Sequence, residues 1–279
     1  MSARVFNGRD FSKDHEQILK DKIKLLSFTP RMASVVFHED DSSQIYTRLK
    51  MEAAVRVGIE FDRVDLSITE QEAEIVGQIR HLSNRQDLYG IMIQKPTKKI
   101  IRGKVRNFSD WWELLTGAID PQKDVDCLTR TNLDSVYRGE SVFIPATARA
   151  VLHILDTALT SSIRNQKIAI VGRSELVGRP LHYIFEKSGA QSYLLGSKDD
   201  LKAVTTKADI IISATGVPSL IKADMIKSGS IIIDVGEPKG DVDFESVKAK
   251  VSFITPVPDG VGPVTVVSLL ENLFSLVAN

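Results

Sequence analysis

The sequence predicts an α/β protein of two domains, the second built on a doubly wound parallel sheet. The 279 residues are enough for two hydrophobic cores. From Ile168 onward, short β-branched runs recur every 17 to 24 residues, with segments able to form helices between them. The first half follows the same alternation less regularly. This alternation is typical of parallel sheets covered by helices, whose ligands bind at the carboxyl ends of the strands.

The predicted elements follow in chain order. In the first half, helices are expected near 11–26, 42–57 and 69–82, and strands near 33–37, 61–66 and 89–93. In the second half, strands are expected near 168–171, 192–195, 209–213, 230–235 and 251–254.

Two further helices set the domain limits. A helix over 147–159 places apolar side chains on one face and is predicted to bridge the domains. The last helix, 263–277, is apolar around much of its girth, so we expect it to be buried and to pack back on the first domain. The predicted domains are therefore residues 1–145 with 264–279, and residues 146–263, facing one another across a cleft.

Bulk composition narrows the function classes. Thirty-six basic and 36 acidic residues cancel, so no overall field favours nucleic acid or an anionic membrane surface. The single cysteine, Cys127, excludes an internal disulfide, and no secretory signal or membrane span is visible. We expect a soluble, cytoplasmic protein. The five histidines lack paired ligand spacing and are interpreted as structural or surface residues, so no metal is expected.

The most informative segment is 168–180, in which a buried strand runs into a glycine turn and a helix start. Gly172 permits the sharp turn, and Gly178 lets the helix approach the sheet closely. Backbone N–H groups at such a helix start bind phosphate, so a dinucleotide is the expected ligand. Ser174 stands where a middle glycine would be, so an ordinary strand-to-helix turn is the alternative.

The first domain contains candidates for chemistry. A helix over 41–50 puts Ser43, Tyr46 and Lys50 on one face. The neighbouring stripe is predicted to be the core side of this helix, with Ile45, Leu49 and Ala53. Taken alone, Lys50 fits a solvated helix lysine and Tyr46 a half-buried packing residue.

Other polar groups can join them at the edge of the sheet. Gln94 follows the strand ending at Ile93, and Asp124 and Asp126 lie in a turn-like segment. Amide, amine, phenol and carboxylate can therefore converge, although a turn-forming aspartate is the plainer interpretation of Asp126.

Several segments carry a family-specific combination and order: 6–8, 43–50, 90–94, 123–126, 145–147, 172–180, 233–236 and 254–263. With them the chain resembles the bifunctional methylenetetrahydrofolate dehydrogenase/methenyltetrahydrofolate cyclohydrolase family over nearly its whole length. The resemblance implies NADP-dependent oxidation of 5,10-methylenetetrahydrofolate and hydrolysis of the product to 10-formyltetrahydrofolate. It also implies two α/β domains around a cleft, a Rossmann-like second domain, a homodimer and a place in one-carbon metabolism and purine biosynthesis.

The resemblance assigns roles by position. It implies that Lys50 is the catalytic lysine, that Gln94 steers it and that Asp126 holds the pterin N–H groups. Tyr46 would pack against the folate. The implied substrate-binding residues also include Ser43, Ile93, Lys95, Pro256, Val257, Pro258, Asp259 and Gly260. The implied cofactor-binding residues are Gly172, Arg173, Ser174, Ser197 and Glu237.

The two reactions make different demands. Hydride loss from the methylene carbon leaves a cation that its nitrogens already stabilise, so the dehydrogenase step mainly needs a well-placed nicotinamide. Ring opening adds water and moves protons, which an amine such as Lys50 can do as base and then acid.

The second strand of the nucleotide domain indicates the cofactor. It ends in Gly196-Ser197-Lys198, without an acid at the usual contact with the ribose hydroxyls. Arg173, Ser197 and Lys198 can accept a 2′-phosphate, so NADP is favoured, with NAD as the alternative. Asp199 and Asp200 argue weakly the other way.

This chain departs from the family pattern at the pocket. Lys95-Pro-Thr-Lys98 replaces an apolar segment, and Asp259 replaces a glycine, where its charge is unfavourable unless Lys95 or Lys98 compensates it. Glu237 replaces an apolar residue, and Gly196 a common histidine. These changes leave open a dehydrogenase with weak or absent cyclohydrolase activity.

The connection from Gln94 to Asp124 is longer than usual and basic over 98–106, which is typical of a solvated loop. We hypothesise that it attracts the glutamate tail of folate. The sequence leaves two further functions open, a nucleotide-binding regulatory homologue and a shikimate-type dehydrogenase. The set Tyr46, Lys50, Gln94 and Asp126 argues against the first, and segments 124–126 and 256–258 against the second.

Overall fold

A computed structural model describes residues 3–141 and 143–278. The chain divides into two compact units. The six-stranded unit holds the residues up to Lys13 and the chain from Pro145 to Ser268. The three-stranded unit holds the chain from Asp14 to Ile144 and from Leu269 on.

The sheet of the six-stranded unit is parallel throughout, in the order β1-β9-β8-β7-β5-β6. Its strands are β1 (Arg4–Val5), β5 (Lys167–Val171), β6 (Gln191–Leu195), β7 (Ile210–Ser213), β8 (Ile231–Asp234) and β9 (Phe253–Ile254). Central strands such as β7 are wholly buried, as expected for continuous apolar runs covered on both faces. The predicted doubly wound parallel sheet is confirmed.

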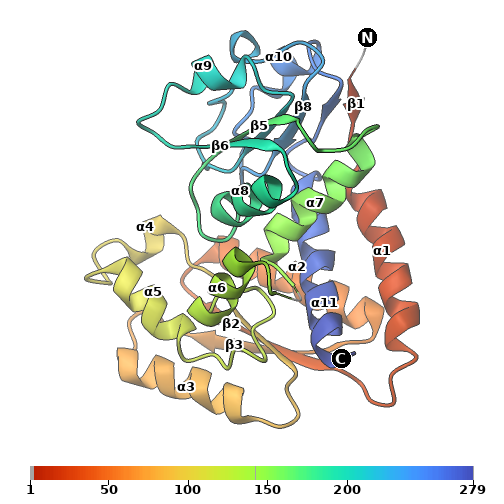
Figure 1. The fold of residues 1–279 in the computed structure, drawn as a ribbon. Helices are drawn as coiled ribbons and strands as arrows, with labels where there is room; N and C mark the ends of the chain where they lie inside the picture. The colour runs from red at the N-terminus through yellow and green to blue at the C-terminus, as the bar shows by residue number, and fades with distance from the viewer. Residues whose placement is uncertain (1–2, 142, 279) are drawn as a thin grey trace. The chain divides into compact units, whose positions relative to one another are not determined.

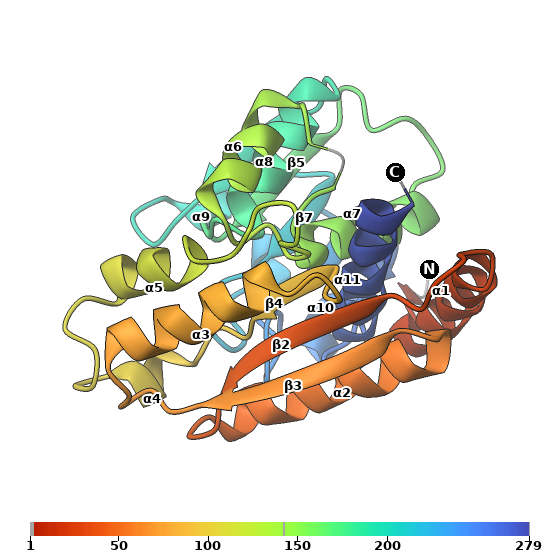
Figure 2. The same cartoon turned by 90° about the horizontal axis from the view of Figure 1, so that it is seen from below.

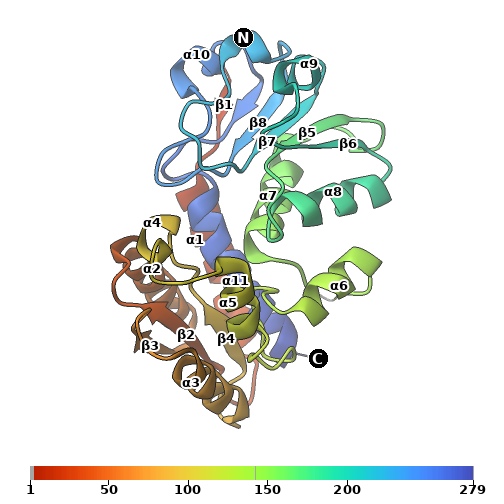
Figure 3. The same ribbon diagram turned by 90° about the vertical axis from the view of Figure 1, so that its left-hand side faces the viewer.

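Helices cover both faces of this sheet. Along one side lie α7 (Ala146–Ala158) and α8 (Gly178–Lys187), and along the other α9 (Leu201–Thr205) and α10 (Phe244–Lys248) (Figures 1 and 3). A 3₁₀ turn, η1 (Ala223–Met225), lies beside α9. The chain leaves β5 toward β6 and then returns to β7 on the other side of β5, so the carboxyl ends of β5 and β7 form a topological switch point.

The three-stranded unit repeats this logic on a smaller scale. Its parallel strands run in the order β3-β2-β4, with α2 on one face and α3 on the other (Figure 2). The bounds are β2 (Arg31–Phe37), α2 (Asp41–Val57), β3 (Glu60–Leu66), α3 (Glu72–Asn84) and β4 (Gly90–Ile93). The unit also contains α4 (Lys98–Ile101), α5 (Phe108–Thr116) and α6 (Arg130–Arg138).

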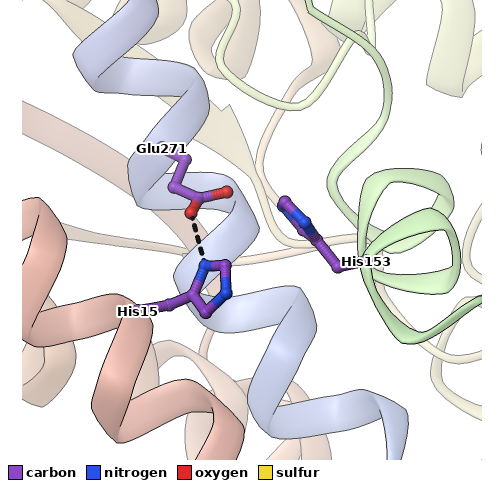
Figure 4. Close-up of side chains that lie close together, drawn as sticks. All are labelled: His15, His153 and Glu271. Carbon is purple, nitrogen blue, oxygen red and sulfur yellow. Dashed lines mark hydrogen bonds and ion pairs between the residues drawn. The ribbon is translucent and has the colours of Figure 1, made fainter. Parts of the chain in front are cut away.

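Two long helices have residues in both units: α1 (Gly8–Ile23) and α11 (Val261–Val277). Within the three-stranded unit, His15 Nδ1 of α1 lies 3.0 Å from Glu271 Oε1 of α11 (Figure 4). Asn272 donates to the carbonyl oxygens of Val125 (2.9 Å) and Ile144 (2.8 Å). The second half of α11 therefore belongs to the core of this unit.

The N-terminus differs from the predicted domain limits. The prediction places residues 1–145 in the first domain, but β1 pairs in parallel with β9 and adds an edge strand to the six-stranded sheet. A strand of two residues gives no periodic signal in the sequence. None of the helices in the described ranges has both the length and the apolar content needed to cross a lipid bilayer.

Candidate active site and cofactor site

Helix α2 buries its polar side, contrary to prediction. The expected core residues Ile45 and Leu49 are 50% and 44% exposed. The buried positions of this helix are Ser43, Thr47, Lys50, Ala53, Ala54 and Val57. The spacing is still helical, but the stripe is turned so that small and polar side chains face inward. The polar side chains of Ser43, Thr47 and Lys50 thus occupy positions that packing alone would give to apolar residues.

Lys50 and Gln94 are in direct contact. Lys50 Nζ donates to Gln94 Oε1 at 2.7 Å, and Lys50 is only 8% exposed. Gln94 follows β4 immediately, and its backbone N–H bonds to Val35 O of β2 (2.8 Å), so its position is set by the sheet. Lys50 and Gln94 are 44 positions apart in the sequence, and Gln94 lies at the carboxyl edge of the three-stranded sheet.

The start of α2 is tied to the loop after β4 by Asp40, which sequence analysis did not identify. Asp40 caps the helix by accepting from Ser43 N (3.4 Å) and also accepts from the Ser43 hydroxyl (3.1 Å) and from Thr97 N (2.6 Å). Ser43 Oγ lies 3.5 Å from Lys95 O. This carboxylate therefore fixes the loop that follows Gln94. Its only sequence signal is its place before a helix.

The segment with Asp124 and Asp126 pairs with β4. Ile91 N donates to Lys123 O (2.6 Å) and Val125 N to Ile91 O (3.3 Å), which brings the two aspartates beside the strand that leads to Gln94. Asp126 is half-buried.

Asp124 is buried and accepts from the N–H groups of Leu128 (2.9 Å) and Thr129 (2.8 Å) and from Asn132 Nδ2 (3.0 Å). Burial raises the pKa of the Asp124 carboxyl, and these donors oppose that rise. Its contacts identify it as the residue that shapes the segment around Asp126.

The structure shows the surroundings of two predicted substrate-binding residues, Ile93 and Lys95. Ile93 is 1% exposed and lies within β4. The Lys95 ammonium lies over the rings of Phe108 (5.3 Å) and Trp112 (5.1 Å) of α5, a cation–π arrangement. The aromatic partners come from a helix that sequence analysis did not predict.

In the six-stranded unit, the loop 256–260 is fastened to the start of α1. Gly8 N donates to Asp259 O (2.9 Å), and a Cβ at Gly8 would lie 2.0 Å from Gly260 O, so only glycine fits there. Of the other loop residues, Pro256 and Val257 are half-buried and Pro258 is exposed.

Asp259 has a basic partner within its own unit. It adopts φ 74°, the left-handed conformation that glycine adopts more easily. Arg9 Nε lies 2.6 Å from Asp259 Oδ1, so the Asp259 carboxylate is paired with an arginine of α1 in the same unit. The charge that sequence analysis considered unfavourable is therefore paired.

The glycine turn after β5 has the geometry of a phosphate cradle. Gly172 has φ 120°, and a Cβ there would lie 2.4 Å from Ala214 O. A Cβ at Gly178 would lie 1.9 Å from Gly172 O. Ser174 Oγ accepts from Gly178 N (3.3 Å), which closes the turn. Backbone groups approach here more closely than any side chain permits, which fits a dinucleotide phosphate.

The remaining cofactor candidates lie in this turn, after β6 and at the start of α11. Arg173 NH2 lies 2.7 Å from Asp199 Oδ2, and Ser197 is exposed. A Cβ at Gly262 would lie 2.7 Å from Glu237 Oε1, so the Glu237 carboxylate lies at the positive N-terminal end of α11. Arg173 and Ser197 carry hydrogen-bond donors of the kind that can bind a phosphorylated ribose.

Two buried aspartates, missed by sequence analysis as a pair, hold the loop after β8. Asp234 accepts from the N–H groups of Gly236, Asp241 and Val242 (2.9–3.0 Å). Asp241 accepts from the Ser213 hydroxyl (2.9 Å) and from Thr215 N (2.6 Å) at the end of β7. Burial raises the pKa of Asp234 to about 6, with Asp241 adding to the rise and the backbone donors opposing it.

Comparisons with known proteins agree over nearly the whole chain. Residues 6–126 match the model of the tetrahydrofolate dehydrogenase/cyclohydrolase catalytic domain, and residues 145–279 that of its NAD(P)-binding domain. The bifunctional protein FolD of Staphylococcus aureus strain JH9 is 34% identical, covering 98% of this chain and 96% of that protein.

Solved structures agree in fold. The methylenetetrahydrofolate dehydrogenase-cyclohydrolase of Trypanosoma brucei, crystallised with NADP and an inhibitor, is 27% identical, with a TM-score of 0.90 and coverage of 99% and 97%. The Campylobacter jejuni FolD enzyme is 31% identical, with a TM-score of 0.89 and 99% coverage of both chains.

Proposed function

Because the chain belongs to the tetrahydrofolate dehydrogenase/cyclohydrolase family, we propose that it oxidises 5,10-methylenetetrahydrofolate with NADP and hydrolyses the resulting 5,10-methenyltetrahydrofolate to 10-formyltetrahydrofolate. The observation that carries the proposal is the buried contact of Lys50 with Gln94, 2.7 Å apart. Burying the polar face of a helix costs free energy that apolar side chains would not cost. The burial of Lys50 therefore supports a chemical role for its amine.

NADP, when bound, supplies the hydride acceptor. The chain's own residues bind and orient it: the glycine turn at 172–178 presents backbone N–H groups, and Arg173 and Ser197 supply side-chain donors. The family resemblance also assigns Glu237, at the start of α11, to the cofactor site. The family resemblance supports these assignments, and NAD is the alternative cofactor.

For hydrolysis, Lys50 accepts a proton from the attacking water and later returns one to the leaving nitrogen. Gln94 orients the amine through its neutral oxygen. Asp126 accepts hydrogen bonds from the N–H groups of the pterin, which a carboxylate can do with both oxygens. The family resemblance also assigns substrate contacts to Tyr46 and Ser43, on the same helix as Lys50, and to Ile93, Lys95 and the loop 256–260.

Two assays on the purified protein test the proposal. Reduction of NADP in the presence of methylenetetrahydrofolate should be fast, and loss of methenyltetrahydrofolate absorbance should exceed the uncatalysed rate. Activity in the first assay alone would indicate a dehydrogenase with weak cyclohydrolase activity. Failure of both would indicate a nucleotide-binding regulatory homologue and would refute the proposal.

We also propose the cellular setting that the family resemblance implies: a cytoplasmic homodimer that supplies one-carbon units for purine biosynthesis, with neither nucleic acid nor a membrane as partner. The buried free thiol of Cys127 is consistent with a reducing compartment. Sedimentation velocity of the purified protein tests the dimer, and a monomer at micromolar concentration would contradict it.

A further inference from the structure

Arg173, the first residue of the glycine turn after Gly172, has an acidic partner. Its NH2 group lies 2.7 Å from Asp199 Oδ2, and the two side chains are 52% and 34% exposed. Both residues lie at the carboxyl end of the β5-β6 pair, where the adenosine ribose of a dinucleotide binds in folds of this kind.

The backbone fixes Asp199 in this position. Gly196 N donates to the same Oδ2 at 2.6 Å, and Asp199 N donates to Gly196 O at 3.1 Å. The turn that follows β6 therefore aims the carboxylate at Arg173. A Cβ at Gly196 would lie 3.1–3.3 Å from the Nε, Cδ and Cζ atoms of Arg173, so the glycine lets the arginine side chain lie against the turn.

Dinucleotide-binding folds use one of two devices at this point. An acidic residue accepts hydrogen bonds from the ribose hydroxyls of NAD, or an arginine holds the 2′-phosphate of NADP. This chain has both an acidic residue, Asp199, and an arginine, Arg173, and the two side chains form an ion pair with each other.

We propose that Asp199 is a specificity-determining residue that lowers the preference of this chain for NADP over NAD. The inference rests on the proposed function, because it assumes that a nicotinamide dinucleotide binds at the glycine turn. A 2′-phosphate carries about −1.5 to −2 charges. It must share Arg173 with the Asp199 carboxylate and is repelled by it, whereas a ribose hydroxyl can donate to that carboxylate.

The chain offers a variant that separates this role from a structural one. In Asp199→Asn the amide oxygen can still accept from Gly196 N, so the turn is kept while the charge is lost. Asp200→Asn is the matched control. Asp200 caps α9 by accepting from Ala203 N (3.0 Å), a task that asparagine performs equally well. Both variants remove one charge from adjacent positions, but only Asp199 faces Arg173.

Isothermal titration calorimetry with NADP or NAD, in the absence of folate, measures the effect. We expect Asp199→Asn to tighten NADP binding about fivefold to tenfold, the size of one partly screened charge interaction, and to leave NAD binding unchanged or weaker. Asp200→Asn should change neither dissociation constant by more than about twofold. In an Arg173→Met background the gain from Asp199→Asn should shrink, because the shared partner is missing.

The inference is overturned if Asp199→Asn and Asp200→Asn give the same ratio of NADP to NAD affinities, or if the intact protein and both variants bind neither dinucleotide. Turnover is measured separately. If the Asp199→Asn shift in affinity is present but no turnover occurs, the inference stands and the proposed function fails. If turnover occurs with an unchanged affinity ratio, the inference alone fails.

Discussion

Lys50 carries an amine on the buried side of a helix, where a charge is costly unless it is hydrogen-bonded. Gln94 Oε1 is a neutral acceptor, and both –NH₃⁺ and –NH₂ can donate to it. This bond therefore positions the amine without requiring that it stay protonated. Such a partner suits the proposed role of Lys50, in which the amine gains and loses a proton.

Replacement of this amine should separate the two proposed activities. Lys50→Met keeps most of the side-chain volume, and we expect hydrolysis to fall about 10²- to 10⁴-fold, the usual contribution of a positioned acid or base. Dehydrogenation should fall less, because it depends on positioning. Initial rates in both assays measure this. Lys24→Met, at a position 61% exposed, is the control and should change neither rate. Equal losses in both activities would contradict a proton-transfer role.

At the scale of elements, the strand-to-helix turn at 172–178 depends on glycine for close backbone contact. The added Cβ in Gly178→Ala would lie 1.9 Å from Gly172 O, so the turn must shift. We expect a loss of more than about 1 kcal/mol in the free energy of unfolding and weaker cofactor binding. Gly77→Ala, within α3 and with no atom closer than 4 Å, should instead stabilise by up to about 1 kcal/mol. Chemical denaturation of both variants measures these values, and losses of similar size would refute the contact argument.

The basic segment 98–106 contains α4 and an exposed turn rather than the plain loop that its composition predicts. Lys99, Arg102, Lys104 and Arg106 are exposed. If they attract the glutamate tail of folate, changing all four to glutamine should raise KM for polyglutamylated substrate several-fold and leave KM for the monoglutamate nearly unchanged. The effect should weaken as salt rises. An equal change for both substrates would exclude this role.

Sequence patterns predicted the strands well, because buried parallel strands are continuous apolar runs. For α2 they failed in part: the periodicity of Ile45, Leu49 and Ala53 indicates a core stripe, but only Ala53 is buried, and Lys50 lies on the buried side. Helices α5 and α6 were not predicted, although Trp111 and Trp112 of α5 are buried. Lys50, Gln94 and Asp126 were predicted as site residues only in combination, and the structure brings Lys50 and Gln94 into contact. Arg173 and Asp199 are 26 positions apart in the sequence, so no periodic pattern indicates that they are in contact.

For the molecule as a whole, Asp234 makes stability depend on pH. Its pKa is about 6 in the folded chain against 3.8 in the reference state, so the folded chain holds this proton more tightly. The resulting stabilisation is fully present below about pH 4 and is lost as pH rises through about 6. Two pKa units correspond to roughly 3 kcal/mol.

Asp234→Asn removes the titrating group and should flatten this dependence. We expect the difference in free energy of unfolding between the natural chain and the variant to fall by up to roughly 3 kcal/mol from pH 4 to pH 7. Urea denaturation across this range measures it. Asp241→Asn, which removes the neighbouring charge, should move the transition to lower pH. A difference that stays constant with pH would show that Asp234 titrates normally.

The short strand β1 matters when the six-stranded unit is produced as a separate fragment. Arg4–Val5 covers the outer side of β9, and without it the hydrogen-bonding groups of β9 would face solvent. An uncovered strand edge is a template on which a second molecule can add its own strand. A fragment cut at Pro145 would therefore tend to self-associate, and joining residues 1–13 to its start should keep it dispersed.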